Sequence, residues 1–339
     1  MVNAKGFISS NFTKTFFTIF MPFFLIISLV YLVRISSLTS QIQITFTELF
    51  QLYSYSVPDI IFYTLPISFI AALTNVLLKL SQSNELIALY ALGLKATKVL
   101  RSLLLLGLLF SILLAAISFL AMPLSKQLYK EFKSSKKADA KLHIVAGKLG
   151  QKFGDYYIYV KENKEDKFED VVIYNRTKQN EEQFFSSREG VVNKVDGITS
   201  LQLGDGYGYT FSDKKLQQSK YQSLEVYDNK KKKIFKFNDI LQYWGQAKTN
   251  KKRLHRMLFF GFVSLIPLLS VYLIAAFSMI NPRYQEGHSF MIILLTSVGL
   301  YFVASSLEKW GKFSYLFIAV ISVYLLGRWL FYKRVSKYF

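Results

Sequence analysis

Six stretches of the sequence are long and apolar enough to cross a lipid bilayer, and this feature constrains the fold more than any other. A helix needs about 20 apolar residues to cross the hydrocarbon core. The chain also contains 31 Phe and 22 Tyr but only 19% charged residues, which is unusual for a soluble protein of 339 residues. We therefore predict an α-helical polytopic membrane protein whose six transmembrane helices are roughly Thr15–Val33, Ile60–Leu80, Ser102–Met122, Met257–Ile280, Ser289–Leu307 and Phe313–Tyr332.

Lysine and arginine are distributed unevenly over the short segments that flank these helices. Only Arg34, Lys309 and Lys312 lie on the side opposite to the two chain ends. Because basic residues accumulate on the cytoplasmic side of membrane proteins, we predict that both termini are cytoplasmic and that the long insert after the third helix is outside. Eleven basic residues share the side of the chain ends: Lys5, Lys14, Lys79, Lys95, Lys98, Arg101, Arg283, Arg328, Lys333, Arg334 and Lys337.

The insert at residues 123–256 differs in character from the rest of the chain. It is polar and contains short runs in which apolar and polar residues alternate, among them DYYIYVKE, FEDVVIYN and GYGYTF. Such alternation between Gly, Asn and Asp turns is typical of antiparallel strands. We predict an inserted periplasmic all-β domain of the jelly-roll type at 123–256. Transmembrane helices 1–3 then occupy residues 1–122, and helices 4–6 occupy residues 257–339.

The sequence contains none of the motifs that mark common catalytic or nucleotide-binding sites. It lacks GxxxxGK[ST], HExxH and GxSxG, and it has no cysteine. No predicted transmembrane helix carries an acidic residue near its middle, as ion-coupled transport requires. We therefore expect no catalytic residue, no metal and no cofactor, and we expect any transport to draw its energy from another subunit.

A shorter amphipathic stretch lies on the cytoplasmic side, between the second and third predicted transmembrane helices. Residues 84–100, NELIALYALGLKATKVL, are predicted to form a helix capped by Asn84 or Ser83. Two interpretations follow: a helix that rests on the lipid headgroups, or a docking helix that fits a groove on a cytoplasmic partner. Glu85 stands at the positive N-terminal end, and one face carries Leu86, Leu89, Tyr90 and Gly93.

This stretch and three others resemble a known family. SNELIALYALGLK is similar to the coupling-helix segment of the LptF/LptG lipopolysaccharide export permeases, with its Ser–x–Glu start and a later glycine. YLVRISS, VPDIIFYTLPISFIAAL and FSMINPRYQEG resemble segments of the same family at the first, second and fourth transmembrane helices, and they lie closer to the LptF branch. The resemblance extends over the full length, with six transmembrane helices around an external jelly roll.

The resemblance implies a function and a set of partners. The chain would be the permease subunit of an ABC-type transporter that extracts lipopolysaccharide from the bacterial inner membrane and passes it to a periplasmic bridge. It would have no ATPase site of its own. Its partners would be an LptG-like sister permease, an LptB-like ATPase dimer, and LptC-like and LptA-like periplasmic jelly-roll proteins. Lipid would enter between the first transmembrane helix of one permease and the fifth helix of the other.

The resemblance also assigns roles to individual residues. Arg34, Lys309 and Lys312 would meet the anionic lipid headgroup, although basic side chains at this level also snorkel to the membrane surface without a ligand. Contacts with the ATPase would be made by Glu85, Leu86, Leu89, Gly93 and Arg283. Simple anchoring to the membrane is the alternative for the basic residues of this surface.

Two rival functions share the main features of the sequence. One is a different ABC permease with a periplasmic insert, serving lipoprotein release or efflux. The other is a membrane scaffold that transports nothing and uses its β domain to bind a partner. The count of six transmembrane helices argues against the other ABC permease, which usually has fewer. Contact between Glu85 and an ATPase separates the scaffold from a transporter, because a scaffold would tolerate Glu85→Lys and a transporter would lose coupling.

Overall fold

The computed structural model describes residues 4–39, 45–140, 145–153, 156–164, 167–176, 181–195, 198–212, 215–227, 237–282 and 286–337. The chain forms two compact units, each described here by itself. The helical unit contains the N-terminal helix, Thr45–Lys130 and the chain from Phe237 onward. The second unit lies mainly within Glu131–Lys236 and holds a β-sheet.

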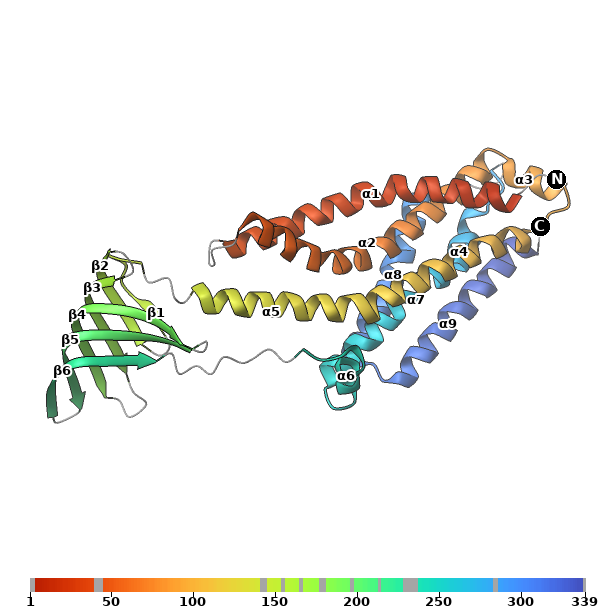
Figure 1. Cartoon of the computed structure of the whole chain (residues 1–339). Coiled ribbons are helices and arrows are strands. Elements are labelled where there is room, and N and C mark those ends of the chain that lie inside the picture. The colour runs from red at the N-terminus through yellow and green to blue at the C-terminus, as the bar shows by residue number, and fades with distance from the viewer. Residues whose placement is uncertain are drawn as a thin grey trace. The chain divides into compact units, whose positions relative to one another are not determined.

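Among the described residues, the helical unit contains six helices that are long and apolar enough to cross a membrane, as predicted (Figure 1). The third of these helices consists of two α-helices that are joined by a π-helical turn at Ile117–Ala121. The sixth continues into a π-helical turn at Tyr332–Ser336. In chain order the helices are α1 (Ala4–Thr39), α2 (Phe46–Gln82), α4 (Ala96–Ala116) with α5 (Met122–Ala140), α7 (Lys251–Ser278), α8 (Ser289–Trp310) and α9 (Phe313–Phe331).

Two of these helices form the centre of the helical unit. In the most apolar stretch of α2, 72% of the residues are buried, and in α7 the share is 61%. The corresponding shares are 11% in α1, 17% in α8 and 6% in α9, so these three helices present most of their apolar side chains outward. Since a helix that is apolar all round is either buried or faces lipid, α1, α8 and α9 are the lipid-facing or partner-facing helices.

The boundaries between the two units differ from the boundaries predicted for the insert. Residues 123–130 and 237–256 belong to the helical unit rather than to the β domain. Gln127 lies just before the chain leaves the helical unit, and Asn238 lies just after the chain returns to it. The Gln127 Nε2 donates to the Asn238 carbonyl at 3.1 Å, and the Gln127 Oε1 accepts from the Asn238 N–H at 2.9 Å. Gln127 is buried, and this pairing satisfies both ends of its amide.

The sheet is a six-stranded antiparallel meander in which every strand pairs with the next one in sequence. An inserted all-β domain was predicted, and the fold class is confirmed. Among the described residues the strand order is sequential, without the crossing connections of a jelly roll. The strands are β1 (Gln151–Phe153), β2 (Tyr156–Lys164), β3 (Lys167–Arg176), β4 (Glu182–Val195), β5 (Ile198–Ser212) and β6 (Lys215–Tyr227).

A single crease divides this sheet into two halves. In β5, Leu201 and Leu203 point inward before the crease, but Gly206 and Gly208 do so after it, so the inward-facing positions change from odd to even numbers. Asp205, between them, has a φ of +42° and produces the change. The same shift occurs in β3 around Asp170, whose φ is +51°. The buried apolar residues of both halves belong to one core.

The crease follows one row of opposed residues across five strands. The row consists of Lys161 on β2, Asp170 on β3, Arg188 on β4, Asp205 on β5 and Gln222 on β6, each flanked on both sides by paired residues of the ladder. The signs of the charges alternate over the first four residues of the row, and Gln222 is uncharged. At β4 the Ser187 hydroxyl donates to the Glu189 carbonyl at 2.6 Å and also bonds the Gly204 carbonyl, which satisfies backbone groups where the ladder is interrupted.

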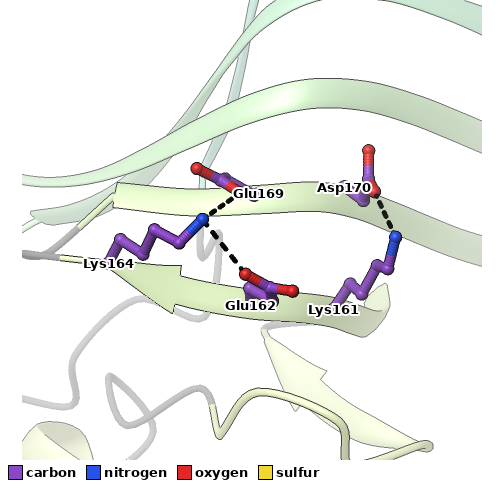
Figure 2. Close-up of polar contacts among 5 residues, drawn as sticks. All are labelled: Lys161, Glu162, Lys164, Glu169 and Asp170. Carbon is purple, nitrogen blue, oxygen red and sulfur yellow. Dashed lines mark hydrogen bonds and ion pairs between the residues drawn. The ribbon is translucent and has the colours of Figure 1, made fainter.

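Figure 2 shows the ion pairs at the β2–β3 end of this row. Lys161 Nζ lies 3.2 Å from Asp170 Oδ2, and Lys164 Nζ lies 3.1 Å from Glu169 and 3.2 Å from Glu162. The hydrogen bond that Lys161 donates to Asp170 raises the pKa of Lys161, and those that Lys164 donates to Glu169 and Glu162 raise the pKa of Lys164. These pairs are exposed, so they fix strand alignment more than they contribute to stability.

Gly206 is expected to be the residue of the crease that tolerates substitution least. A Cβ there overlaps the Ser186 carbonyl and the Tyr221 ring, whereas a Cβ at Gly204 meets nothing within 4 Å. We expect Gly206→Ala to cost about 1–3 kcal/mol, because the backbone carbonyl cannot move aside. Hydrogen exchange of β5 and β6 peptides measures this. Gly204→Ala, the matched control, is expected to exchange like the wild type, and equal effects of the two would contradict the crease geometry.

Candidate functional site

The segment between α2 and α4 is a short helix followed by a turn, not the single helix predicted over residues 84–100. α3 spans Glu85–Ala91, and α4 begins only at Ala96. The Gly93 N–H donates to the Tyr90 carbonyl at 2.9 Å and the Leu94 N–H to the Leu89 carbonyl at 3.2 Å. With Gly93 at a φ of +81°, these bonds make a Schellman C-cap. The glycine that was assigned to the helix face therefore ends the helix.

The start of α3 also differs from the prediction. Asn84 precedes the helix with a φ of +59°, and its side chain forms no capping hydrogen bond. Its carbonyl accepts from the Ala88 N–H at 3.0 Å. Asparagine tolerates the left-handed conformation better than most residues, so its role here is to turn the chain out of α2 rather than to cap α3. α3 is consequently held between two tight turns.

The predicted docking face of α3 points into the protein. Leu86 and Leu89 are 2% and 9% exposed and belong to the core of the helical unit. Tyr90 packs against the same core, and burial raises the pKa of its hydroxyl. Leu92, which was not singled out from the sequence, is 73% exposed. The exposed residues of this segment are thus Ala88, Ala91, Leu92 and Gly93, and Glu85 is half-buried.

The loop that follows α7 is attached beside this surface by Ser81, a residue that the sequence analysis did not single out. The Ser81 hydroxyl, at the end of α2, donates to the Ser278 carbonyl at 2.8 Å and accepts from the Ile280 N–H at 3.3 Å. The loop that follows α7 is thereby fixed beside the start of α3. Arg283, predicted to contact an ATPase, lies outside the described residues.

The three predicted headgroup residues lie on different helices. Arg34 is on the last part of α1, Lys309 is in the last turn of α8, and Lys312 precedes α9. All three are exposed. Helix direction places them at the end of the helical unit opposite to α3 and both termini (Figure 1). Within the described part of the chain none of the three forms an ion pair.

An ion pair lies at this same end, and sequence reasoning missed it. Lys126 Nζ on α5 is 3.4 Å from Asp59 Oδ1 on α2 and 5.1 Å from the centre of the Phe260 ring on α7. The second predicted transmembrane helix began at Ile60, one residue after Asp59. The structure extends α2 back to Phe46, so the aspartate stands inside a membrane-spanning helix. Charged residues in such helices mark functional sites more often than elsewhere.

A short segment before α7 clamps the π-helical turn in the third transmembrane helix. It consists of α6 (Ile240–Gly245) and a 3-10 turn at Gln246–Lys248. The Trp244 indole N–H donates to the Phe119 carbonyl inside the π-helical turn at 2.9 Å. The Arg253 guanidinium donates to the Tyr243 carbonyl at 2.7 Å and stacks on its ring at 4.1 Å. π-helical turns accommodate such inserted partners and are frequent at functional sites.

Removing the indole donor is expected to loosen this turn. Trp244→Phe keeps an aromatic ring beside Phe119 but loses the hydrogen bond, which is worth about 1 kcal/mol. We expect faster hydrogen exchange across Ile117–Ala121, with α8 unchanged as the internal control. Unchanged exchange at the π-helical turn would show that ring packing alone holds it.

A unit of six membrane-spanning helices with an inserted β domain defines the class: this is a multi-pass helical membrane protein of the permease type. The model of the family "Lipopolysaccharide export system permease LptF/LptG" matches residues 7–332, and the chain belongs to that family. No curated protein matches the chain. The chain is accordingly a lipopolysaccharide export permease, the membrane component of an export system that includes a partner permease and an ATPase. The family model covers both branches, LptF and LptG.

Proposed function

We propose that the chain is one half of the transmembrane unit of an ABC-type exporter that extracts lipopolysaccharide from the bacterial inner membrane. An LptG-like sister permease forms the other half, and an LptB-like ATPase dimer supplies the energy. The β domain lies in the periplasm and hands the lipid to LptC-like and LptA-like proteins. Both termini and α3 are cytoplasmic in this arrangement, as the distribution of basic residues predicts.

The observation that carries this proposal is the unequal burial of the membrane-spanning helices. α1 and α8 leave large apolar side chains uncovered, with Val33 72% and Phe302 73% exposed. α2 and α7 are covered by their own chain. A lateral entrance between α1 of one permease and α8 of the other requires both helices to be uncovered, and they are two of the three uncovered helices, with α9. Lipid tails and the sister permease are both suitable occupants of such surfaces.

The α3 segment is the proposed contact with the ATPase. Glu85 and Gly93 keep the roles predicted for them, and Leu92 becomes the apolar anchor in place of the buried leucines. Leu86 and Leu89 hold the segment from behind. A charge-assisted hydrogen bond from Glu85 to the partner would contribute about 1.5–3 kcal/mol. Arg283 is proposed to secure the neighbouring loop or to contact the same ATPase.

Arg34, Lys309 and Lys312 are proposed to bind the phosphates of the lipid headgroup. Their placement on α1, α8 and the start of α9 puts them beside the proposed entrance. For the periplasmic transfer we propose strand addition at a sheet edge. The edges of the described sheet are β1, with 3 residues, and β6, with 13, so β6 is the edge long enough to pair with a strand of a partner's β domain.

Co-purification tests this proposal. The full chain is solubilised as wild type and as Glu85→Lys, and the co-purifying proteins are identified by mass spectrometry. We expect the wild type to bring down a sister permease and a nucleotide-binding subunit, and the charge reversal to lose only the latter. Glu131→Lys, on the exposed surface of α5, is the control and is expected to keep both. If the wild type retains neither partner, the scaffold function replaces the exporter.

A further inference from the structure

The Asp59–Lys126 pair is partly buried, and it links two different helices. The side chains are 25% and 31% exposed, so the pair is partly removed from solvent and still accessible. The pair joins α2 to α5, which are separated in sequence by the α3 turn and the whole of α4. Removing one partner of a half-buried pair leaves the other charge poorly solvated, so each ion needs a counter-charge.

The surroundings of the pair are positive. Arg256 and Lys130 lie close enough to repel the Lys126 ammonium, and Asp59 is the carboxylate that offsets it. Within the described residues neither Arg256 nor Lys130 forms an ion pair. Asp59 is the carboxylate that pairs with Lys126 in a group of three cations contributed by α5 and α7, and Glu308 is a second carboxylate near this surface. Such a group attracts an anion with more than one charge.

Lys126 is also able to change partners. Its ammonium carries three donors on a flexible four-carbon stem, and the Phe260 ring below it offers a favourable surface to a cation in any of several positions. A phosphate carries more charge and more acceptor oxygens than the Asp59 carboxylate. It would therefore compete effectively for Lys126 among the neighbouring cations.

We propose that the Asp59 carboxylate neutralises Lys126 while no lipid is bound, and that a phosphate on the headgroup of the transported lipid replaces Asp59 as the partner of the Lys126 ammonium. The inference rests on the proposed export function and deepens its headgroup site. Asp59 then returns to Lys126 as the lipid leaves, and this competition lowers the affinity for the lipid and favours its release.

Binding by the full chain in phosphatidylcholine nanodiscs tests the exchange, with diphosphoryl lipid A, fully dephosphorylated lipid A and inorganic phosphate as probes. Native mass spectrometry gives the dissociation constants. For diphosphoryl lipid A, Lys126→Met is expected to weaken binding about tenfold. Asp59→Asn is expected to tighten binding about fivefold, because the competitor is gone. Lys126→Arg keeps the cation and is expected to bind like the wild type.

The double variant separates exchange from a merely structural ion pair. If Asp59 acts through Lys126, then Asp59→Asn has no effect once Lys126 is Met, and the double variant binds like Lys126→Met alone. A structural pair predicts instead that both single variants bind more weakly or that neither changes, and either result overturns the inference. Lys98→Met removes the same charge from an exposed site near the start of α4 and is the control.

The remaining probes identify the source of the anion. Dephosphorylated lipid A is expected to bind all variants equally, and tightening by Asp59→Asn with this probe would overturn the inference. Millimolar inorganic phosphate is expected not to displace the lipid, and displacement would assign the site to a soluble anion. If the wild type binds no diphosphoryl lipid A at all, the export function itself fails. Normal wild-type binding with indifferent variants contradicts only the exchange.

Discussion

Gly107→Leu is expected to separate α4 from α7 and to lower the stability of the helical unit strongly. A Cβ at this position already lies 3.0 Å from Val271 Cγ2, 3.1 Å from the Pro267 carbonyl and 3.2 Å from the Leu268 Cα. Two of these atoms belong to the backbone of α7 and cannot rotate away. A leucine side chain therefore forces the helices apart, at a cost of about 3 kcal/mol or more.

The measurement is thermal unfolding of the detergent-solubilised chain, followed by tryptophan fluorescence. All three tryptophans, at 244, 310 and 329, lie in the helical unit, so the signal reports on that unit alone. Gly299→Leu, on α8, is the matched control because a Cβ there meets nothing within 4 Å. We expect a lower midpoint for Gly107→Leu only. Equal midpoints would mean that α4 and α7 do not pack as closely as described.

Leu86→Asp is expected to lose stability and Leu92→Asp to lose association with the ATPase, although both leucines belong to the same short segment. Leu86 is 2% exposed and packs in the core, so the variant buries an unpaired carboxylate and costs about 3–5 kcal/mol. Leu92 is 73% exposed, so the same substitution changes stability by less than about 0.5 kcal/mol. If Leu92 anchors the ATPase, its replacement weakens that association about tenfold or more.

Two readouts on the same preparations separate these outcomes. The thermal midpoint falls for Leu86→Asp and stays for Leu92→Asp. Co-purification of the ATPase falls for Leu92→Asp even though the chain remains folded. A Leu92→Asp variant that retains the ATPase at the wild-type level would remove Leu92 from the contact. A Leu86→Asp variant with an unchanged midpoint would show that α3 is not fixed to the core.

The membrane-spanning helices were predictable because their signal depends on length and composition alone. A stretch such as Ser289–Leu307 is apolar over its whole length, and α8 begins at the predicted residue. The ends of α2 were less predictable. Pro58 and Asp59 are typical of a helix boundary, yet neighbouring helices satisfy the groups that proline frees, and α2 continues through both.

The details of the site depend on features that hydrophobic periodicity does not contain. Leu86, Leu89, Tyr90 and Gly93 fit one helical face, but Gly93 adopts a left-handed conformation and ends the helix. A glycine after an apolar run is a known C-cap signal, and weighing it more heavily would have found the turn. Leu86 and Leu89 do lie on one apolar face of the helix, as the periodicity predicted. It is occupied by the chain's own core and not by a partner.

Two further features arise from tertiary pairing. The crease of the sheet requires Asp170 and Asp205 to lie in one row across the sheet, with Arg188 between them, and sequence alternation within one strand does not reveal that alignment. The change in alternation along β5, from Leu201 and Leu203 to Gly206 and Gly208, is the local trace of the crease. The Asp59–Lys126 pair joins residues far apart in the chain, and no local pattern connects them.

Transport in proteoliposomes tests the central claim most directly. The chain is purified with its sister permease and ATPase, reconstituted with lipopolysaccharide, and mixed with a soluble jelly-roll acceptor that carries a photocrosslinking group. The account predicts that the acceptor becomes crosslinked to lipopolysaccharide only when ATP is present, and that Glu85→Lys abolishes the ATP-dependent signal. Equal crosslinking without ATP, or full activity of Glu85→Lys, would contradict the claim that this permease is driven through α3 by a separate ATPase.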